Sequence, residues 1–106
     1  MVFTNDQATP VNVLPGLRRK TLAQSQSLMM CEFRFDANVT IPIHSHPHEQ
    51  VGYLAEGRVE MTIDGKKYQM KKGDSYCAPS NVPHGVLTIE PSVIVDVFYQ
   101  PREDYR

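Results

Sequence analysis

The sequence of 106 residues lacks an excess of charge of one sign, a long apolar run and more than two cysteines. Eleven basic and twelve acidic residues give a net charge of −1, which provides no basic surface for nucleic acid or an anionic membrane. No apolar run approaches the roughly 18–20 residues that a membrane span needs. Cys31 and Cys77 lie far apart without C-x-x-C spacing, so we expect buried thiols and no disulfide or zinc knuckle.

The N-terminus also lacks the apolar segment of a secretory signal, and we therefore expect a cytoplasmic protein. Hydrophobic residues make up 41% of the chain and charged residues 22%, which is typical of a globular protein. A chain of this length buries only about 60–70% of its unfolded surface when it folds. We therefore expect one domain over residues 1–106 with one core.

No window of the sequence shows helical periodicity, and prolines and glycines divide it into short segments that resemble β-strands. Asp64-Gly65 between alternating segments is a strong hairpin signal. The expected strands cover residues 18–24, 28–36, 41–45, 50–56, 58–63, 66–70, 75–78, 84–89 and 92–99. Many short strands without intervening helices predict an all-β antiparallel sandwich or barrel.

The segment 92–99 is apolar on both of its faces. Ile94, Asp96 and Phe98 alternate with the odd-numbered residues, which are valines and a tyrosine. A strand of this kind needs cover on both sides. A second subunit or an N-terminal strand around residues 11–14 would each provide the second cover.

All four histidines fall in two places: His44, His46 and His48 lie within eight residues, and His84 follows a proline-rich turn. Residues i and i+2 of a strand share a face about 6.5–7 Å apart, so two imidazoles can converge on one ion. His84 could add a ligand from the far half of the chain. By spacing alone, a set of solvated loop histidines is an equal alternative.

Two separated motifs resemble those of the cupins. They read His44-x-His46, three residues, Gln50, six residues, Gly57, and then Gly73, five residues, Pro79, one residue, Asn81, two residues, His84. The resemblance implies a single cupin domain, an antiparallel jelly-roll (double-stranded β-helix) barrel. It also implies one divalent transition metal ion at the barrel mouth, held by His44, His46, Gln50 and His84.

Gln50 stands where most metal-binding cupins have glutamate. An amide oxygen carries no charge, so three imidazoles and Gln50 would leave a divalent ion its full charge. Such a shell favours Lewis-acid chemistry on an anionic substrate over oxygen chemistry, and it suits nickel, zinc, iron, cobalt or manganese. Alternatively, Gln50 only forms hydrogen bonds beside the ion. Glu49 points to the opposite strand face, and we expect His48 to be exposed or to lie behind the ligands.

The segment Asp96 to Tyr105, together with residues 47–50 and 81–84, resembles a narrower family, the KdgF pectin-degradation cupins. Members convert 4,5-unsaturated uronates from pectin or alginate to linear 4-deoxy-5-keto acids. The resemblance carries active-site roles to Asp96, Phe98 and Arg102.

Each of these three residues also has a plainer interpretation. An inward carboxylate such as Asp96 suits proton transfer, or it could bond to backbone at the sheet end. Arg102 could hold a uronate carboxylate in two hydrogen bonds, or be a solvated terminal arginine. Phe98 could stack on the sugar or fill the core.

Other functions remain open at this point. A metal-dependent dioxygenase, another isomerase and a non-catalytic sugar-binding module all fit the scaffold. As partners we expect a small-molecule substrate and a second copy of the chain in a homodimer, with no nucleic acid and no membrane. The sequence leaves the roles of Arg34, Tyr53 and Tyr76 undecided, and the run of basic residues 18–20 is interpreted as a solvated face.

Overall fold

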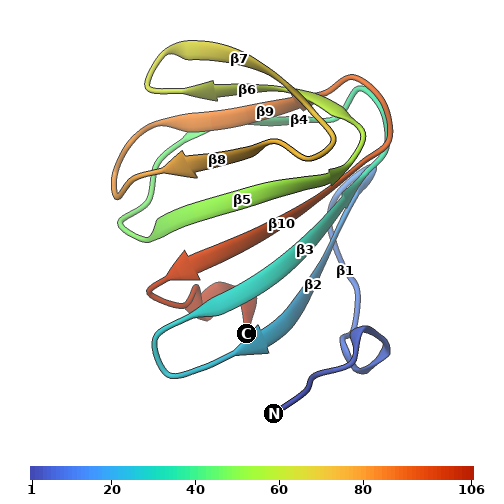
Figure 1. Ribbon diagram of the computed structural model, residues 1–106, viewed down its shortest axis with the longest axis vertical. Coiled ribbons are helices and arrows are strands. Elements are labelled where there is room, and N and C mark those ends of the chain that lie inside the picture. Colours follow the sequence, from blue (N-terminus) through green and yellow to red (C-terminus); the bar gives the residue numbers. More distant parts are fainter.

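A computed structural model describes residues 1–106 and consists of strands joined by short loops (Figure 1). The strands are β1 (Val11–Leu14), β2 (Leu17–Gln24), β3 (Met29–Phe35), β4 (Thr40–His44), β5 (Glu49–Glu56), β6 (Arg58–Ile63), β7 (Lys66–Lys71), β8 (Ser75–Ala78), β9 (His84–Thr88) and β10 (Ser92–Tyr99). Two single 3-10 turns, η1 (Asn5–Gln7) and η2 (Glu103–Tyr105), are the helical elements. Neither is long and apolar enough to cross a membrane.

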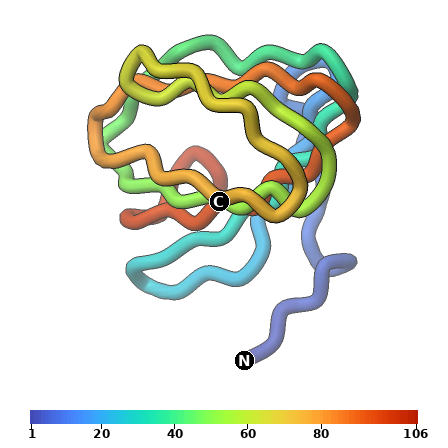
Figure 2. The backbone as a smooth tube through the Cα atoms, turned by 45° about the horizontal axis from the view of Figure 1, so that its top comes forward, coloured from blue at the N-terminus to red at the C-terminus, as the bar shows by residue number.

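The strands form two antiparallel sheets that face each other (Figures 1 and 2). One sheet has the order β1-β2-β3-β10-β5-β8 and the other the order β4-β9-β6-β7. Neighbours in both sheets are often far apart in sequence, as β3 and β10 are, which is the topology of a jelly roll. The all-β cupin jelly roll expected from the sequence is confirmed.

The β6–β7 hairpin forms where the sequence predicts it. Asp64 and Gly65 adopt φ angles of 52° and 76°, and Ile63 pairs with Lys66 across them. Positive φ at both central residues gives a turn whose twist matches that of the flanking strands, and glycine adopts it without steric cost. The hairpin therefore follows from local sequence alone.

The core lies between the sheets and takes one face of each strand. Along β10, Ile94, Asp96 and Phe98 are buried, as the alternation predicts. The odd-numbered valines are half-buried, and Tyr99 is exposed. The 13 core residues are Leu17, Met29, Cys31, Phe33, Phe35, Val39, Leu54, Val59, Met61, Met70, Val86, Ile94 and Phe98. Cys31 is a buried free thiol, as expected. The expectation of a buried thiol is wrong for Cys77, which is exposed because it lies on the face of β8 opposite that of the buried Ala78.

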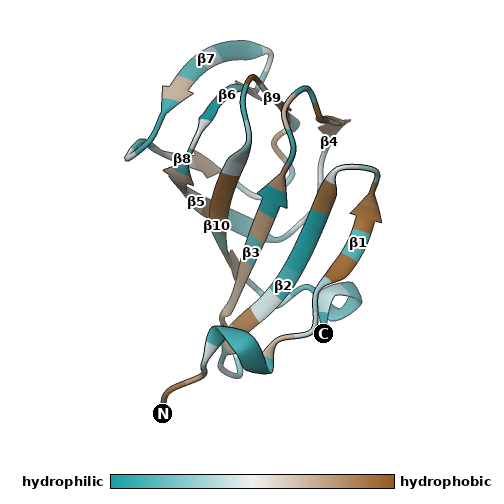
Figure 3. Cartoon of the chain, turned by 90° about the vertical axis from the view of Figure 1, so that its right-hand side faces the viewer, coloured by the Kyte–Doolittle hydropathy of each residue, from teal (hydrophilic) through white to brown (hydrophobic).

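The N-terminal strand does not cover the outer face of β10. Instead β1 pairs with β2 at the edge of the six-stranded sheet, where β2 and β3 separate it from β10. Figure 3 shows that β10 is hydrophobic over much of its length. The alternative that an N-terminal strand covers β10 is therefore wrong. The outer face of β10 stays available for a second subunit.

Candidate metal centre and active site

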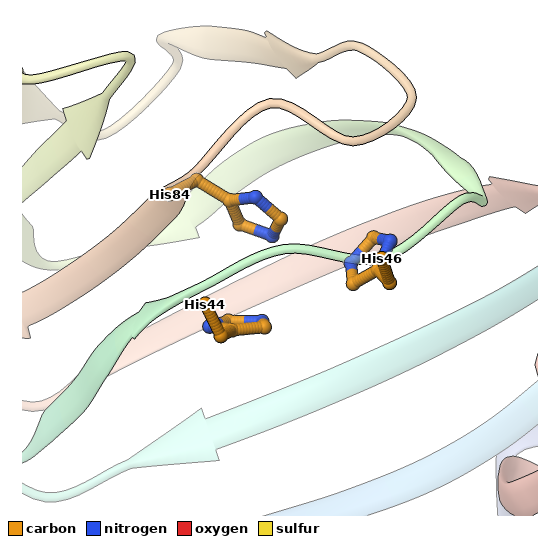
Figure 4. Close-up of side chains that lie close together, drawn as sticks. All are labelled: His44, His46 and His84. Carbon is orange, nitrogen blue, oxygen red and sulfur yellow. The ribbon is translucent and has the colours of Figure 1, made fainter.

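Three histidines from different elements converge at one end of the space between the sheets (Figure 4). His44 ends β4 and pairs in register with His84, the first residue of β9. Each of His44, His46 and His84 offers one ring nitrogen, and these nitrogens all lie within 4.8 Å of one another. His46 lies in the loop after β4 and not on the strand, in contrast to the expectation of a strand-borne pair, yet it reaches the same centre.

The loop that carries His46 is held by the loop before His84. The Asn81 backbone N–H donates to the His46 carbonyl over 2.8 Å, and the Ser80 hydroxyl donates to the Pro47 carbonyl over 2.6 Å. Asn81 adopts a φ of 64°, a left-handed conformation that asparagine tolerates better than most residues. The two cupin-like motifs thus touch each other, and this contact positions the histidines.

Backbone carbonyls determine which nitrogen of each ring carries the proton. The Nδ1 atoms of His44, His46 and His84 lie 2.8, 3.0 and 2.9 Å from the carbonyl oxygens of Pro42, His48 and Val82. A carbonyl only accepts hydrogen bonds, so each Nδ1 donates. In the neutral rings each Nε2 therefore keeps its lone pair free to bind a metal ion.

The remaining contacts fit a cation at this point. His84 Nε2 is buried and has no hydrogen-bond partner. His46 Nε2 lies 3.0 Å from Gln50 Oε1, although both atoms are acceptors when the ring is neutral. Two ligands that each lie about 2.1 Å from one ion are about 3 Å apart when they meet at a right angle. The donor set of three Nε2 atoms and one amide oxygen therefore suits a divalent transition metal ion.

The environment keeps two of the rings neutral. Burial lowers the pKa of His46, and the positive charges of Arg102 and His84 lower it further. Burial also lowers the pKa of His84. Both rings are thus in the state that binds metal at neutral pH.

Asp96 is buried beside this centre and makes only side-chain hydrogen bonds there. Gln50 Nε2 donates to its Oδ2 over 3.0 Å, and the Tyr76 hydroxyl donates to its Oδ1. Burial raises the pKa of Asp96 to about 7, while these two hydrogen bonds act in the opposite direction. The alternative that the Asp96 carboxylate bonds to the backbone at the sheet end is therefore wrong.

The C-terminal segment turns back after β10 and brings Arg102 to the same cavity (Figure 1). The Arg102 side chain is only 15% exposed, and its guanidinium lies 5.6 Å from the Phe98 ring centroid and 4.3 Å from that of Tyr105. Its Nε and Nη2 donate to the two carboxylate oxygens of Asp104 over 3.2 and 3.1 Å. Partial burial raises the pKa of Asp104, but the hydrogen bonds and charge of Arg102 outweigh it and lower the pKa.

One cavity joins these groups. Its polar wall is formed by His44, Gln50, Tyr76, His84, Asp96 and Arg102, and the rest of its lining is mostly apolar and aromatic. Phe98 is buried and lies at this cavity, so it both fills the core and faces any bound molecule. The arrangement combines a carboxyl group of raised pKa, a guanidinium and a cluster of imidazole nitrogens that could hold a metal ion around an apolar space.

Most residues singled out from the sequence come together here, and others do not. Glu49 is exposed, and His48 is half-buried with its ring 5.5 Å from that of His46. Arg34 points outward, where its Nε pairs with Glu32 Oε1 over 3.0 Å.

Sequence reasoning missed Tyr105 and Arg19, whose guanidinium carbon lies 4.1 Å from the Tyr105 ring centroid. It also left Tyr76 undecided, although Tyr76 shares the inward face of its strand with the buried Ala78. The two-residue spacing between Tyr76 and Ala78 was the one sequence feature that could have indicated an inward tyrosine.

Comparison with known proteins gives the same fold and the same narrower resemblance. The chain is 38% identical over 105 residues to the pectin degradation protein KdgF of Dickeya dadantii. The alignment covers 97% of this chain and 96% of that protein. The solved structure of KdgF from Halomonas sp. superposes with a TM-score of 0.94 at 32% identity and covers 100% of this chain and 98% of the other.

An RmlC-like cupin from Shewanella frigidimarina superposes with a TM-score of 0.92 at 29% identity, over the whole of both chains. The cupin domain family matches residues 31–98, from β3 to the end of β10. These residues include all three converging histidines, Gln50 and Asp96. The protein therefore belongs to the cupin family and resembles KdgF over almost its entire length.

Proposed function

We propose that this protein is a metal-dependent enzyme of pectin or alginate breakdown that converts 4,5-unsaturated uronates to linear 4-deoxy-5-keto uronates. The observation that carries the proposal is the meeting of the histidine cluster, the buried Asp96 and Arg102 at one cavity. The similarity to KdgF over nearly the whole chain supports a role in pectin degradation. Gln50, rather than glutamate, supports chemistry on an anionic substrate.

We propose His44, His46, Gln50 and His84 as the metal ligands. A divalent ion held there supplies Lewis-acid stabilisation of negative charge that develops on a substrate oxygen. The three Nδ1 contacts to backbone carbonyls orient the rings before the ion arrives. Nickel, zinc, iron, cobalt and manganese all suit this donor set.

Arg102 binds the substrate carboxylate in this mechanism. Asp104 occupies its Nε edge, which leaves the edge formed by Nη1 and Nη2 for two parallel hydrogen bonds to the uronate. The rings of Phe98 and Tyr105 support the guanidinium plane and keep water from that side of the cavity.

Asp96 moves the proton. As the bond between C1 and the ring oxygen breaks, its carboxylate accepts the proton of the anomeric hydroxyl, which leaves an aldehyde at C1 and an enolate at C5. The same carboxyl then returns a proton to C4, which gives the 5-ketone with no net change of atoms. A pKa of about 7 suits a group that both accepts and donates a proton near neutral pH.

The test is an assay of the purified protein on unsaturated galacturonate and mannuronate monosaccharides, after elemental analysis of its metal content. We expect loss of the absorbance of the 4,5-double bond, and loss of that activity after chelation with recovery when metal is returned. Binding in a calorimeter without turnover would support a sugar-binding module instead. Oxygen uptake with phenols would support a dioxygenase.

Arg102→Ala tests the carboxylate contact. We expect KM to rise by about tenfold or more with a smaller change in kcat, because two charge-assisted hydrogen bonds to the substrate are lost. An unchanged KM would contradict the role of Arg102. Asp104→Asn is the comparison variant, since it keeps the side-chain shape but removes the charge and one of the two acceptors beside the guanidinium. It should raise KM less than Arg102→Ala, because the guanidinium itself remains.

We further propose that two copies associate through the outer face of the six-stranded sheet. Met30, Val51, Tyr53, Val95 and Val97 meet there across neighbouring strands, and none of them is charged. Apolar patches of this kind mark association sites. Light scattering should give a dimer for the wild type and a monomer for Val51→Asp, and a monomeric wild type would contradict the proposal. The cytoplasmic location stays a prediction.

A further inference from the structure

One row of residues across the six-stranded sheet has an unusual composition. Asp96 of β10 pairs with Gly52 of β5, and Gly52 pairs with Tyr76 of β8, so three inward positions lie side by side. The outer two are two strand spacings apart, about 9.5 Å. Nevertheless the Tyr76 hydroxyl donates a hydrogen bond to Asp96 Oδ1.

Gly52 makes this contact possible. A Cβ at residue 52 would lie 2.1 Å from Cε1 of Tyr76 and 2.2 Å from Oδ1 of Asp96. Contacts this short do not occur in proteins, so any side chain at residue 52 would displace the ring, the carboxylate or both. Because Gly52 has no side chain, the Tyr76 ring can cross above it and reach the Asp96 carboxylate.

The Tyr76 hydroxyl also sets the orientation of Gln50. It accepts a hydrogen bond from Gln50 Nε2 over 2.6 Å, and the same nitrogen donates to Asp96 Oδ2 over 3.0 Å. Both hydrogens of the amide group are thereby used. The Gln50 Oε1 must then face the opposite way, toward His46 Nε2 at 3.0 Å. Three side chains form a closed ring of hydrogen bonds between the proposed acid and the proposed ligands.

We infer that Tyr76 is a positioning residue that holds both the Asp96 carboxylate and the Gln50 amide, and that Gly52 is required to admit it. The inference deepens the proposed function and rests on it for the role of Asp96. Without the hydroxyl, Asp96 Oδ1 loses its donor and one Gln50 hydrogen loses its acceptor. Both groups can then rotate away from the geometry that reaction and metal binding need.

Tyr76→Phe tests the inference, because it removes the hydroxyl and keeps the ring that packs against the core. We expect kcat to fall about tenfold or more while KM changes less than about twofold. In the Asp96→Asn background the same substitution should have a much smaller effect, because its main partner is already altered. Tyr68→Phe, at an exposed tyrosine of β7, is the matched control and should keep the wild-type kcat.

A second readout does not depend on turnover. In the cobalt-loaded protein, Tyr76→Phe should change the visible absorption spectrum and weaken cobalt binding by about tenfold, because Gln50 loses one of its two anchors. Tyr68→Phe should leave both unchanged. Wild-type kcat and an unchanged cobalt spectrum in Tyr76→Phe would overturn the inference. A wild type that does not act on uronates would instead refute the proposed function, and the cobalt spectrum would still test Tyr76.

Discussion

The candidate site has two halves that are held in place by different means. In the histidine cluster, every Nδ1 contact is to a backbone carbonyl two residues away in the chain. In the Asp96 network, the contacts join residues 20, 26 and 46 positions apart. In the first half, local backbone orients each ring, while the β4–β9 pairing and the contact between two loops bring the rings together. The second half depends on the register of three strands. Gln50 belongs to both halves, because its Nε2 donates to Tyr76 and Asp96 while its Oε1 faces His46. A change to a histidine should therefore spare the Asp96 network, whereas a change in that network should reach the histidine cluster only through Gln50.

Removing a histidine should have the largest effect. His84→Ala removes one of the three converging nitrogens and should reduce the metal content and the activity to near background, while the Asp96 network stays intact. Elemental analysis measures the metal content of the purified variant, the uronate assay measures its activity, and circular dichroism checks that the fold is kept. His48→Ala is the matched control, because His48 contributes only its backbone carbonyl to this cluster. Full metal occupancy in His84→Ala would contradict the ligand assignment.

Asp96→Asn should break the other half. The isosteric amide cannot accept and return a proton, so we expect kcat to fall by about 10²–10⁴-fold. The metal content should remain that of the wild type, because the histidines keep their own carbonyl contacts. Steady-state kinetics on the uronates and elemental analysis give the two values. Full activity in this variant would rule out the acid–base role.

Gly52→Ala should show that the second half depends on strand register. The added methyl group collides with Tyr76 and Asp96, and we expect the free energy of unfolding to fall by about 2–3 kcal/mol, with a loss of kcat. Gly73→Ala is the reference, since a Cβ there meets nothing within 4 Å and only the φ of 97° is strained. It should cost about 1 kcal/mol and leave kcat unchanged. Equal stability losses measured in urea would argue against the steric explanation.

The two halves should respond to pH in opposite directions in the metal-free protein. Native Asp96 keeps its proton up to a pKa of about 7, whereas the unfolded chain loses it near 3.8. Between these values the native state binds more protons, so this contribution to stability declines as pH rises, by at most about 1.4 kcal/mol per pH unit. His46 and His84 have lowered pKa values, so their contribution declines as pH falls below about 6.5.

Urea unfolding of the metal-free protein across pH 4–8 separates these contributions. Relative to Asp96→Asn, the wild type should lose stability as pH rises toward 7. Relative to His84→Ala, it should lose stability as pH falls below about 6.5. Parallel curves for wild type and Asp96→Asn would show that the carboxyl is not held neutral by the fold.

Much of the architecture was predictable because it depends on local patterns. Strand positions follow from alternation and turn residues, and each expected strand agrees with the observed one to within one residue at both ends. Residues 11–14, considered only as a possible cover for β10, form an edge strand instead. The convergence of His44, His46 and His84 was expected from two spaced motifs, although His46 lies in a loop and not on the strand.

Other features of the site were not predictable in the same way. Tyr76 carries no motif, and Gly52 has an ordinary negative φ, so neither turn chemistry nor spacing marks it. Arg19 belongs to a charge run that is typical of a solvated surface, yet it stacks on Tyr105 from a distant part of the chain. Each of these roles depends on which residue lies opposite in a neighbouring strand or segment.

The strands and the hairpin at Asp64-Gly65 follow from the sequence, because alternation and turn residues are local patterns. The proposed ligands His44, His46, Gln50 and His84 came from the resemblance of two motifs to those of the cupins, since spacing alone left solvated histidines as an equal alternative. The assembled sheet places Tyr76, Gly52 and Asp96 in one row, and the hydrogen bonds of this row turn the Gln50 oxygen toward His46. The physical reason is that hydrogen bonds between strands are set by register, and register is a property of the assembled sheet.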